Sequence, residues 1–308
     1  MPDSESPPPV IGVDVGGTGI KALLVDGAGR VLDERRVPTP QAGPRVAERV
    51  LDAVAECAAG LADAAPEPPA AVGLAVPGIV DDERGVAVYS ENLGWHDVPF
   101  PDLLTARIGL PVAFGHDVRV GGLAEARIGA GRGVSNLAFV PLGTGIAAAL
   151  YLDGRPYAGR GYAGEIGHTD VGHGEPCVCG ANGCLEAIAS AAAIARRYSQ
   201  RSGHHAAGAR EVLKAAAAGD ADAAAVWTEA LDALGLSLSW LASVLAPEAI
   251  VIGGGLAEAG DALLVPLAER LDARLTFQPR PRLLRASLGD RAAALGSALL
   301  ARDLAGPR

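Results

Sequence analysis

The chain alternates between short apolar runs, typical of buried strands, and segments whose apolar residues recur every three or four positions, typical of helices. In its first part, Val46, Val50, Val54 and Leu61 keep helical spacing until Pro66 ends the pattern. The strands predicted around this helix are residues 10–15, 21–25, 31–37, 71–76 and 112–114. The resulting order β-β-β-α-β describes a small α/β domain.

The second part of the chain repeats the alternation with longer helices. Its predicted strands are residues 137–141, 146–151, 249–252 and 283–288. Its predicted helices are residues 118–128, 185–198, 221–245, a segment from about 260, and 292–304. We expect the helix over 221–245 to break near Gly235, and residues 201–208 to form a polar loop.

Length and charge narrow the possible functions. A chain of 308 residues predicts two domains with room for a sizeable core. The net charge of −10 argues against a surface that binds nucleic acid, because such a surface needs a basic stripe. It is compatible with binding of a small neutral molecule. Residues 1–9 lack the regions of a signal peptide, and the apolar runs are too short to span a bilayer. We therefore expect a cytoplasmic enzyme without nucleic-acid or membrane partners.

Three of the four cysteines, Cys177, Cys179 and Cys184, fall close together, and His168 precedes them. One histidine and three cysteines make a complete tetrahedral ligand set for a structural zinc ion. A redox pair would leave a third thiol over, and a disulfide framework needs an oxidising compartment, of which the sequence gives no sign. The glycines that let the backbone turn tightly in this stretch are 172, 174, 180 and 183.

Two carboxylates flank this cluster. Glu165 lies three positions before His168, and Glu186 lies two positions after Cys184. A bound zinc ion would fix both carboxylates in positions suited to sugar hydroxyls. The alternative is that both glutamates are simply solvated on the surface.

Two turns rich in glycine and threonine join predicted strands. Residues 14–21 read Asp-Val-Gly-Gly-Thr-Gly-Ile-Lys, in which glycines leave backbone amides open to anions and Asp14 can hold Mg²⁺ through water. This turn is neither a Walker loop nor a Gly-x-Gly-x-x-Gly motif, so a plain hairpin is the alternative. Residues 142–145, Leu-Gly-Thr-Gly, repeat the chemistry and suggest a duplicated fold with two phosphate-contacting hairpins.

Three further segments carry candidate chemistry. Residues 253–255 are three glycines between a predicted strand and a predicted helix, which is typical of nucleotide binding or of a tight turn. Asp117 opens a predicted helix directly after a strand, where an aspartate is usually an N-cap and can also be a general base. Residues 90–95 form a polar loop that contains Asn92, and an ordinary turn is its plain interpretation.

In this order the motifs resemble those of the ROK family of sugar kinases, the bacterial glucokinase type within the actin-like ATPase superfamily. The resemblance covers about residues 10–304. The motifs that carry it are Asp14-Val15-Gly16-Gly17-Thr18-x-x-Lys21, Pro77-Gly78, Asn92-Leu93-Gly94-Trp95, Leu142-Gly143-Thr144-Gly145, Gly164-Glu165-Ile166-Gly167-His168, Cys177-x-Cys179-Gly180-x-x-Gly183-Cys184-Leu185-Glu186 and Ile252-Gly253-Gly254-Gly255.

The resemblance implies an α/β fold of two actin-like (ribonuclease H-like) domains, with the site in the cleft between them and a structural zinc loop. In such folds the C-terminal helix returns to the N-terminal domain. We therefore expect a small domain at residues 1–115 plus 291–308 and a large domain with the zinc motif at 116–290. Family members are commonly homodimers or homotetramers, so one of these assemblies is expected here.

The implied reaction is transfer of the γ-phosphate of ATP to a hexose, most often at the 6-hydroxyl, with Asp117 accepting the hydroxyl proton. The implied contacts to ATP and Mg²⁺ are Asp14, Gly16, Gly17, Thr18, Lys21, Gly143, Thr144, Gly254 and Gly255. The implied sugar contacts are Gly78, Asn92, His116, Asp117, Glu165, His168 and Glu186. The resemblance also implies that His168 gives one ring nitrogen to zinc and the other to a sugar hydroxyl.

The sequence departs from the family pattern at two places. The family usually has Asn-Asp followed by Ala-Asn at the catalytic position, where this chain has His116-Asp117 followed by Val118-Arg119. A neutral imidazole offers its donor and acceptor in a different geometry from an amide, so an amino sugar (kanosamine, N-acetylglucosamine or N-acetylmannosamine) is the alternative to glucose. Residues 147–149 are alanines where glycines are common, and we expect their methyl groups to tighten the second phosphate loop.

Three other classes of function are weaker alternatives. A repressor of the same family carries an N-terminal helix-turn-helix, for which we expect no room before a hairpin that begins at Val10. A non-catalytic, sugar-responsive regulator would not need Asp117. A non-kinase ATPase or chaperone of the actin superfamily would not need the cysteine cluster and its flanking glutamates.

Overall fold

The computed structural model describes residues 7–306, which form two compact units. Within that range the small unit comprises residues 7–124, 158–162 and 291–306, and the large unit comprises 125–157 and 163–290. The chain passes from the first unit to the second within one helix and returns near residue 291. The division into functional domains at 1–115 plus 291–308 and at 116–290 stays a prediction.

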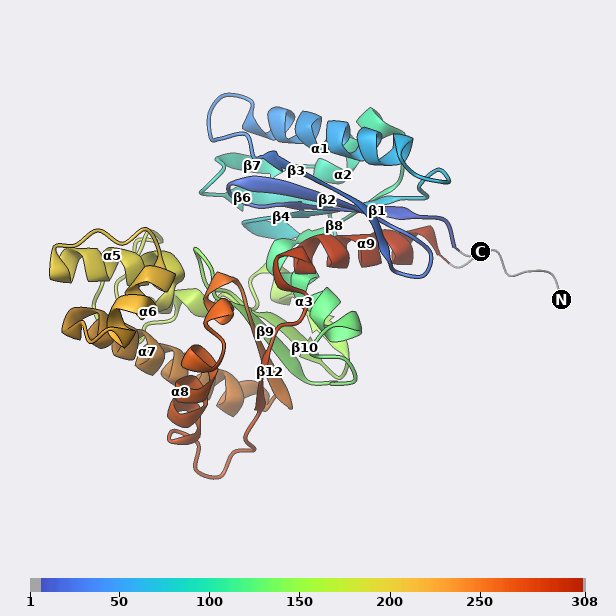
Figure 1. Cartoon of the computed structure of the whole chain (residues 1–308). Helices are drawn as coiled ribbons and strands as arrows, with labels where there is room; N and C mark the ends of the chain where they lie inside the picture. Colours follow the sequence, from blue (N-terminus) through green and yellow to red (C-terminus); the bar gives the residue numbers. More distant parts are fainter. Residues whose placement is uncertain (1–6, 307–308) are drawn as a thin grey trace. The chain divides into compact units, whose positions relative to one another are not determined.

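The small unit is built on a five-stranded mixed sheet (Figure 1). Its order is β3-β2-β1-β4-β8, antiparallel across the first three strands and parallel across the last three. The strands are β1 (Val10–Val15), β2 (Gly19–Val25), β3 (Val31–Pro38), β4 (Val72–Val76) and β8 (Val112–His116). Helix α1 (Val46–Asp63) covers one face and helix α9 (Ala292–Ala305) covers the other (Figure 1).

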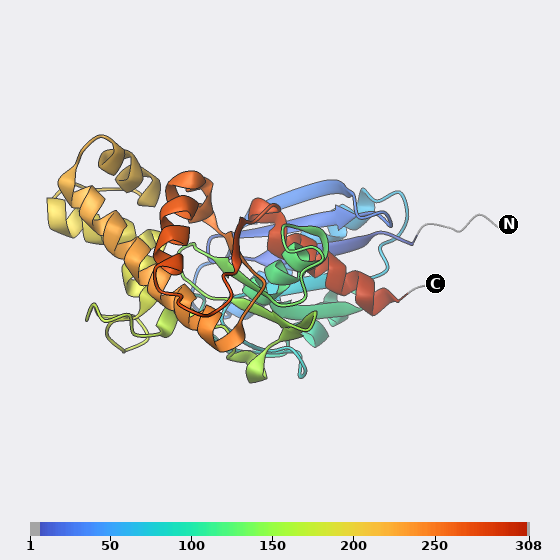
Figure 2. The same ribbon diagram turned by 90° about the horizontal axis from the view of Figure 1, so that it is seen from below.

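The pleat of β1 divides its residues between these two helices. Ile11, Val13 and Val15 belong to the apolar core under α1, whereas Val10 packs with the core of α9. On the α9 side the small residues let the helix backbone approach the strands. A Cβ atom on Gly73 would lie 1.8 Å from the carbonyl oxygen of Ser297. Figure 2 shows α9, in red, beside the blue strands of this sheet.

A second, three-stranded sheet in the small unit was not expected from the sequence. It consists of β5 (Ile79–Asp81), β6 (Val86–Ser90) and β7 (Trp95–Val98), and helix α2 (Phe100–Ile108) follows it. These strands are only three to five residues long, too short for apolar periodicity to appear. The predicted polar loop at 90–95 is the turn that joins β6 to β7.

The large unit also contains a five-stranded mixed sheet, with the order β11-β10-β9-β12-β13. Its strands are β9 (Leu137–Pro141), β10 (Ala149–Leu152), β11 (Arg155–Tyr157), β12 (Ala249–Gly253) and β13 (Arg282–Arg285). Its α-helices are α4 (Leu185–Ala189), α5 (Ala191–Ser202), α6 (Ala209–Ala217), α7 (Ala221–Leu245) and α8 (Asp261–Asp272), and α3 (Asp117–Ile128) enters it from the small unit. The 3₁₀ turns of this unit are η2 (Ile166–His168) and η3 (Gly255–Ala259), whereas η1 (Gly159–Gly161) belongs to the small unit and η4 (Gly289–Arg291) lies where the chain returns to it.

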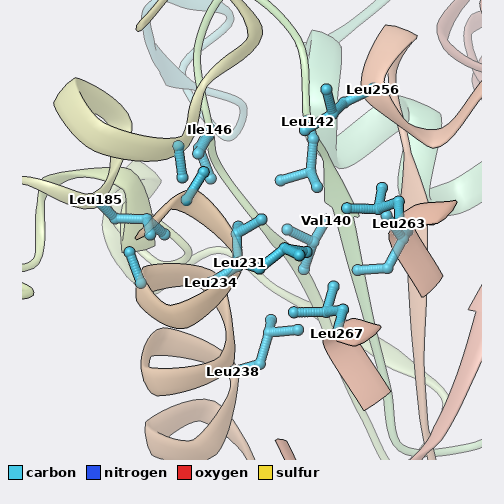
Figure 3. Packing of buried hydrophobic residues seen from close by; sticks show 14 of the residues in the cluster. Val140, Leu142, Ile146, Leu185, Leu231, Leu234, Leu238, Leu256, Leu263 and Leu267 are labelled. Carbon is cyan, nitrogen blue, oxygen red and sulfur yellow. The ribbon is translucent and has the colours of Figure 1, made fainter. Parts of the chain in front are cut away.

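Helix α7 provides the centre of the large unit's core. Its Leu231, Leu234 and Leu238 pack among Val140 of β9 and the leucines of α8 (Figure 3). The predicted break near Gly235 is wrong, because α7 is continuous from Ala221 to Leu245. The glycine instead allows α8 to pack closely, since a Cβ there would lie 2.8 Å from the Cβ of Arg270.

Three other boundaries differ from the prediction. The strand expected over 146–151 starts only at Ala149, because Ile146 pairs back with Leu142 in an isolated bridge. The helix expected over 185–198 is divided at Ser190, whose hydroxyl accepts the N–H of Ala193 and caps α5. Helix α5 then continues into the expected polar loop as far as Ser202.

Helix α6 and the end of β13 also differ from the prediction. Residues 209–217 form an unpredicted helix, and the strand expected over 283–288 is limited to Arg282–Arg285. Across residues 7–306, no helix combines the length and the apolar character needed to span a membrane.

Candidate functional site

The parallel strands of the small unit end along one edge of the sheet. The register pairs Asp14 with Ala75 and Val76 with His116, so β1, β4 and β8 finish side by side. This edge therefore carries Asp14, the Gly78 turn and Asp117. In open α/β sheets, ligands bind at the carboxyl ends of the strands.

The turn between β1 and β2 borders a cavity of about 460 Å³. The N–H of Gly16 donates to the carbonyl of Gly19 at 2.9 Å, and the hydroxyl of Thr39 donates to the carbonyl of Gly16 at 2.7 Å. Gly16, Gly17 and Gly19 all lie outside the positive-φ region, so these glycines serve by leaving the backbone bare of side chains. The cavity is lined by Asp14, Gly16, Thr18, Gly19, Ile20, Lys21, Arg36, Val37 and Pro38.

Sequence reasoning missed Arg36, which lines the same cavity. It stands opposite Lys21 in the register of β2 and β3. Arg36 is paired with the carboxylate of Glu34, with its Nε 2.5 Å from Oε1, and its side chain adds a second cation beside Lys21 to the cavity wall. Pairing the predicted strands 21–25 and 31–37 directly across residues 26–30 places Lys21 opposite Arg35, and only the register shift at Leu24 and Val25 brings it opposite Arg36.

Asp117 is the first residue of α3 and directly follows β8. Its Oδ1 accepts the N–H of the next residue, Val118, at 2.7 Å, whereas an N-cap carboxylate would bind an amide two or three residues on. Burial raises the pKa of this carboxyl to about 6, against the N–H of Val118 and the charge of Arg119, which lower it. A carboxylate with such a pKa is ionised at neutral pH and suited to accept a proton.

Two neighbours of Asp117 in sequence, His116 and Arg119, are buried. The side chain of His116 is only 10% exposed, and its Nε2 lies 3.2 Å from Oδ1 of Asp117. Burial, and then the charge of Arg119, lower the pKa of His116 to about 3, so the ring is neutral. Arg119 makes two contacts to the carboxylate of Asp82, at 3.0 and 3.1 Å, and donates to the carbonyl of Val80.

The two other predicted sugar residues of the small unit lie in turns. Asn92 is exposed in the turn between β6 and β7. Gly78 has φ +102°, and a Cβ there would lie 2.1 Å from the carbonyl oxygen of Tyr89. Only glycine fits this position, which lets the chain after β4 pack against β6.

The large unit gathers its predicted nucleotide residues at the ends of β9 and β12. The N–H of Leu142 donates to the carbonyl of Gly253 at 2.9 Å, and the N–H of Leu256 donates to the carbonyl of Leu142 at 3.0 Å. These bonds bring the turn of Gly143 and Thr144 beside Gly254 and Gly255. The segment after the glycines is the 3₁₀ turn η3, and the helix predicted there begins only at Asp261.

Glu165 and Glu186 both lie near the loop of Gly143 and Thr144. A Cβ on Gly164 would lie 1.9 Å from the carbonyl oxygen of Ala148, and one on Gly167 would lie 2.1 Å from that of Ile146. The half-buried Glu165 lies between these two contacts. The Oε2 atom of Glu186 accepts the N–H of Ile146 at 2.8 Å, which joins a predicted sugar residue to the predicted phosphate loop.

The predicted zinc ligands form one cluster. The ligand atoms of His168, Cys177, Cys179 and Cys184 all lie within 4.8 Å of one another. The sulfurs of Cys179 and Cys184 are 3.6 Å apart, and Nδ1 of His168 is 3.8 Å from the sulfur of Cys177. Zinc–sulfur bonds of about 2.3 Å in a tetrahedron place ligand atoms about 3.8 Å apart, so the donors fit this ion.

The turns within this cluster follow the prediction. Gly172, Gly174, Gly180 and Gly183 all adopt positive φ. Around them, a backbone hydrogen bond from Ala181 lowers the pKa of the Cys179 thiol to about 7, whereas burial raises that of Cys184 to about 12.

Comparisons with known proteins agree on one family. The curated glucokinase of Halalkalibacterium halodurans is 36% identical, over 85% of this chain and 85% of the relative. The crystal structure of the ROK hexokinase from Thermus thermophilus is 35% identical with a TM-score of 0.83, over 95% of this chain and 97% of that chain.

A third relative was solved with its ligands. The ROK family glucokinase of Streptomyces griseus, in complex with glucose and AMPPNP, is 33% identical with a TM-score of 0.82, over 96% of this chain and 99% of that chain. The family model for ROK proteins matches residues 10–304. The chain therefore belongs to the ROK family, as its motifs predict.

Proposed function

We propose that this protein is an ATP-dependent glucose kinase that transfers the γ-phosphate to the 6-hydroxyl of the sugar. The observation that carries the proposal is Asp117, a carboxylate with a pKa of about 6 at the carboxyl edge of the small sheet. The similarity to glucokinases of 36% and 33% identity supports glucose as the substrate.

In the reaction Asp117 accepts the proton of the sugar hydroxyl while the new O–P bond forms and the bond to the β-phosphate oxygen breaks. General-base assistance of this kind accelerates a reaction by about 10²–10⁴-fold. The remaining acceleration comes from positioning and from charge stabilisation of the transferred phosphoryl group. Because its pKa is near 6, Asp117 is ionised before the reaction at neutral pH.

We assign the nucleotide contacts to two glycine-rich loops. In the small unit Gly16, Gly17 and Thr18 form the loop beside Lys21; Gly17 and Thr18 offer their amides and Thr18 its hydroxyl, while the N–H of Gly16 is bonded to Gly19. In the large unit Gly143 and Thr144 contact phosphate, and the neighbouring Gly254 and Gly255 contact the adenosine. Mg²⁺, whose preferred ligands are oxygens, would neutralise the phosphate charge, and the carboxylate of Asp14 on the cavity wall fits it.

Sugar binding is assigned to residues of both units. In the small unit the contacts are Gly78 and Asn92, with Asp117 at the reacting hydroxyl. In the large unit they are Glu165, Glu186 and His168. Because Nδ1 of His168 faces the sulfur of Cys177, its Nε2 is the ring nitrogen left for the sugar.

A structural zinc ion held by His168, Cys177, Cys179 and Cys184 completes this side of the site. When bound it supplies rigidity rather than chemistry, because four protein ligands leave no open position. It would fix Glu165 and Glu186, which lie on either side of the cluster in sequence. We also retain the expectations of a homodimer or homotetramer and of a cytoplasmic location, to be checked by light scattering and cell fractionation.

The function is tested by measuring ADP release with Mg²⁺-ATP over a panel of glucose, mannose, N-acetylglucosamine, N-acetylmannosamine and kanosamine. We expect the highest kcat/KM with glucose. The Asp117→Asn variant should lose about 10²–10⁴-fold in kcat, since it removes the proton acceptor and keeps the shape. An enzyme that is most active on an amino sugar would contradict the substrate assignment, and a fully active Asp117→Asn would contradict the base.

A further inference from the structure

The imidazole of His116 lies against the carboxylate of Asp117, the proposed base. Its Nε2 lies 3.2 Å from Oδ1 of Asp117, and the side chain is nine-tenths buried. Its Nδ1 is fully enclosed and has no hydrogen-bond partner within residues 7–306. An enclosed Nδ1 cannot reach a sugar hydroxyl, which leaves Nε2, the nitrogen that faces Asp117, for the sugar contact expected from the sequence.

The surroundings of the ring determine where its proton lies. The charged groups that face it are Arg119 from α3 and Asp82 from the segment after β5. Burial and Arg119 keep the ring neutral, so it carries one N–H. An ionised carboxylate only accepts hydrogen bonds, so the tautomer with the proton on Nε2 is favoured beside Asp117.

The two oxygens of Asp117 then have different partners. Oδ1 accepts the N–H of Val118 at 2.7 Å and lies within hydrogen-bonding distance of His116. Oδ2 has no hydrogen-bond partner within the described part of the chain. The carboxylate is therefore held through one oxygen while the other is presented to a substrate.

We propose that His116 is a positioning residue, which donates Nε2–H to Oδ1 of Asp117 and so aims Oδ2 at the sugar hydroxyl. The inference rests on the proposed function, in which Asp117 is the base. As the sugar oxygen bonds to the γ-phosphorus and ADP leaves, the hydroxyl proton passes to Oδ2. His116 keeps its own proton throughout.

Three variants of the full chain separate positioning from other roles. His116→Phe keeps a ring and removes the N–H. His116→Gln places an amide N–H near the position of Nε2, whereas His116→Asn places its amide near the position of Nδ1. His205→Phe, in the exposed segment between α5 and α6, is the matched control for loss of an imidazole.

We expect His116→Phe to lower kcat about tenfold, a fraction of the full effect of a base, with KM for glucose and ATP within about twofold of the wild type. The acidic limb of the kcat–pH profile should move up by about one pH unit, because a lost donor destabilises the ionised carboxylate. His116→Gln should restore both kcat and the position of the acidic limb. His116→Asn should behave like His116→Phe, and His205→Phe should behave like the wild type.

Other outcomes overturn the inference. A rise in KM for glucose at constant kcat would assign His116 to the sugar. A lower kcat without a shifted acidic limb, and without rescue by glutamine, would make the residue a packing residue only. If Asp117→Asn is inactive and His116→Phe matches the wild type, this inference fails alone. If the wild type does not phosphorylate glucose, the proposed function fails.

A measurement on the unmodified protein covers the case in which His116→Phe does not fold. Nitrogen-15 spectra of labelled histidine distinguish the two neutral tautomers, and the His116 signals are those absent from His116→Gln. We expect the Nε2–H tautomer at about pH 7, where Asp117 is ionised, and a ring that is still neutral at about pH 5, where an ordinary histidine becomes charged. An Nδ1–H tautomer, or protonation with an ordinary pKa, would contradict the proposal.

Discussion

At the scale of single residues, the carboxylate of Asp117, which we propose as the base, destabilises the folded chain. The pKa of Asp117 is about 6 in the folded chain, above the usual 3.8 of an aspartate. The native state therefore binds the proton more tightly than the unfolded state between these values, and stability falls as the pH rises through this window. Above pH 6 the ionised group costs on the order of 3 kcal/mol.

The Asp117→Asn variant should therefore be inactive and more stable. We expect its Tm to exceed that of the wild type by a few degrees at pH 7, and the difference to shrink towards pH 4, where the wild-type carboxyl is protonated. Differential scanning calorimetry at both values measures this, with the exposed Asp153→Asn as control. A variant that is less stable than the wild type at pH 7 would mean that the carboxylate is stabilising.

At the scale of elements, two glycines allow α9 to approach β1 and β4. A Cβ on Gly12 would lie 2.1 Å from the carbonyl oxygen of Ala294, and the equivalent distance for Gly73 is 1.8 Å to Ser297. The hydroxyl of Ser297 also donates to the carbonyl of Val13 at 2.9 Å. These contacts involve backbone atoms on both sides, so an added methyl group has no flexible side chain to displace.

We expect Gly73→Ala to destabilise the protein by about 1–3 kcal/mol, through overpacking against α9. Urea unfolding with global analysis measures this change. Gly208→Ala is the control, because Gly208 has extended backbone and open space around its Cβ position. Equal stability of the two variants would show that α9 moves away at little cost.

The cysteine cluster lies in the segment that leads into α4. Removing the proposed zinc ion with a chelator should lower the Tm and abolish kinase activity together, because a structural zinc site contributes directly to folding. Metal analysis should give about one zinc per chain in the wild type and none in Cys184→Ser, since the site needs all four ligands. The buried Cys57 lies outside the cluster, so Cys57→Ala should keep the metal.

At the scale of the whole molecule, the sequence predicted the two strand systems and the ROK motifs because each depends on local patterns. The β1–β2 hairpin follows from apolar runs around a glycine turn, and the cysteine spacing predicted a cluster whose ligand atoms lie close together. The sheet of β5, β6 and β7 escaped prediction because its strands are too short. Arg36 escaped because its place depends on the pairing of strands rather than on its own neighbours in sequence.

Long-range contacts also explain why sequence position alone was misleading for two residues. Gly235 looked like a helix break, yet the packing of α8 keeps α7 continuous. Asp117 looked like an N-cap, yet its raised pKa comes from burial, which depends on the folded surroundings. No pattern within a window of the sequence contains these effects.

The placement of α9 has a consequence for synthesis of the protein on the ribosome. The strands that α9 covers, β1, β2, β4 and β8, all lie before residue 117, whereas α9 itself follows the whole large unit along the chain. During translation one face of β1 and β4, the face that carries Gly12 and Gly73, therefore stays exposed. It stays exposed while more than two hundred further residues are synthesised. The small unit, although first to emerge, is the last to be completed, and the nascent chain needs protection from aggregation until then.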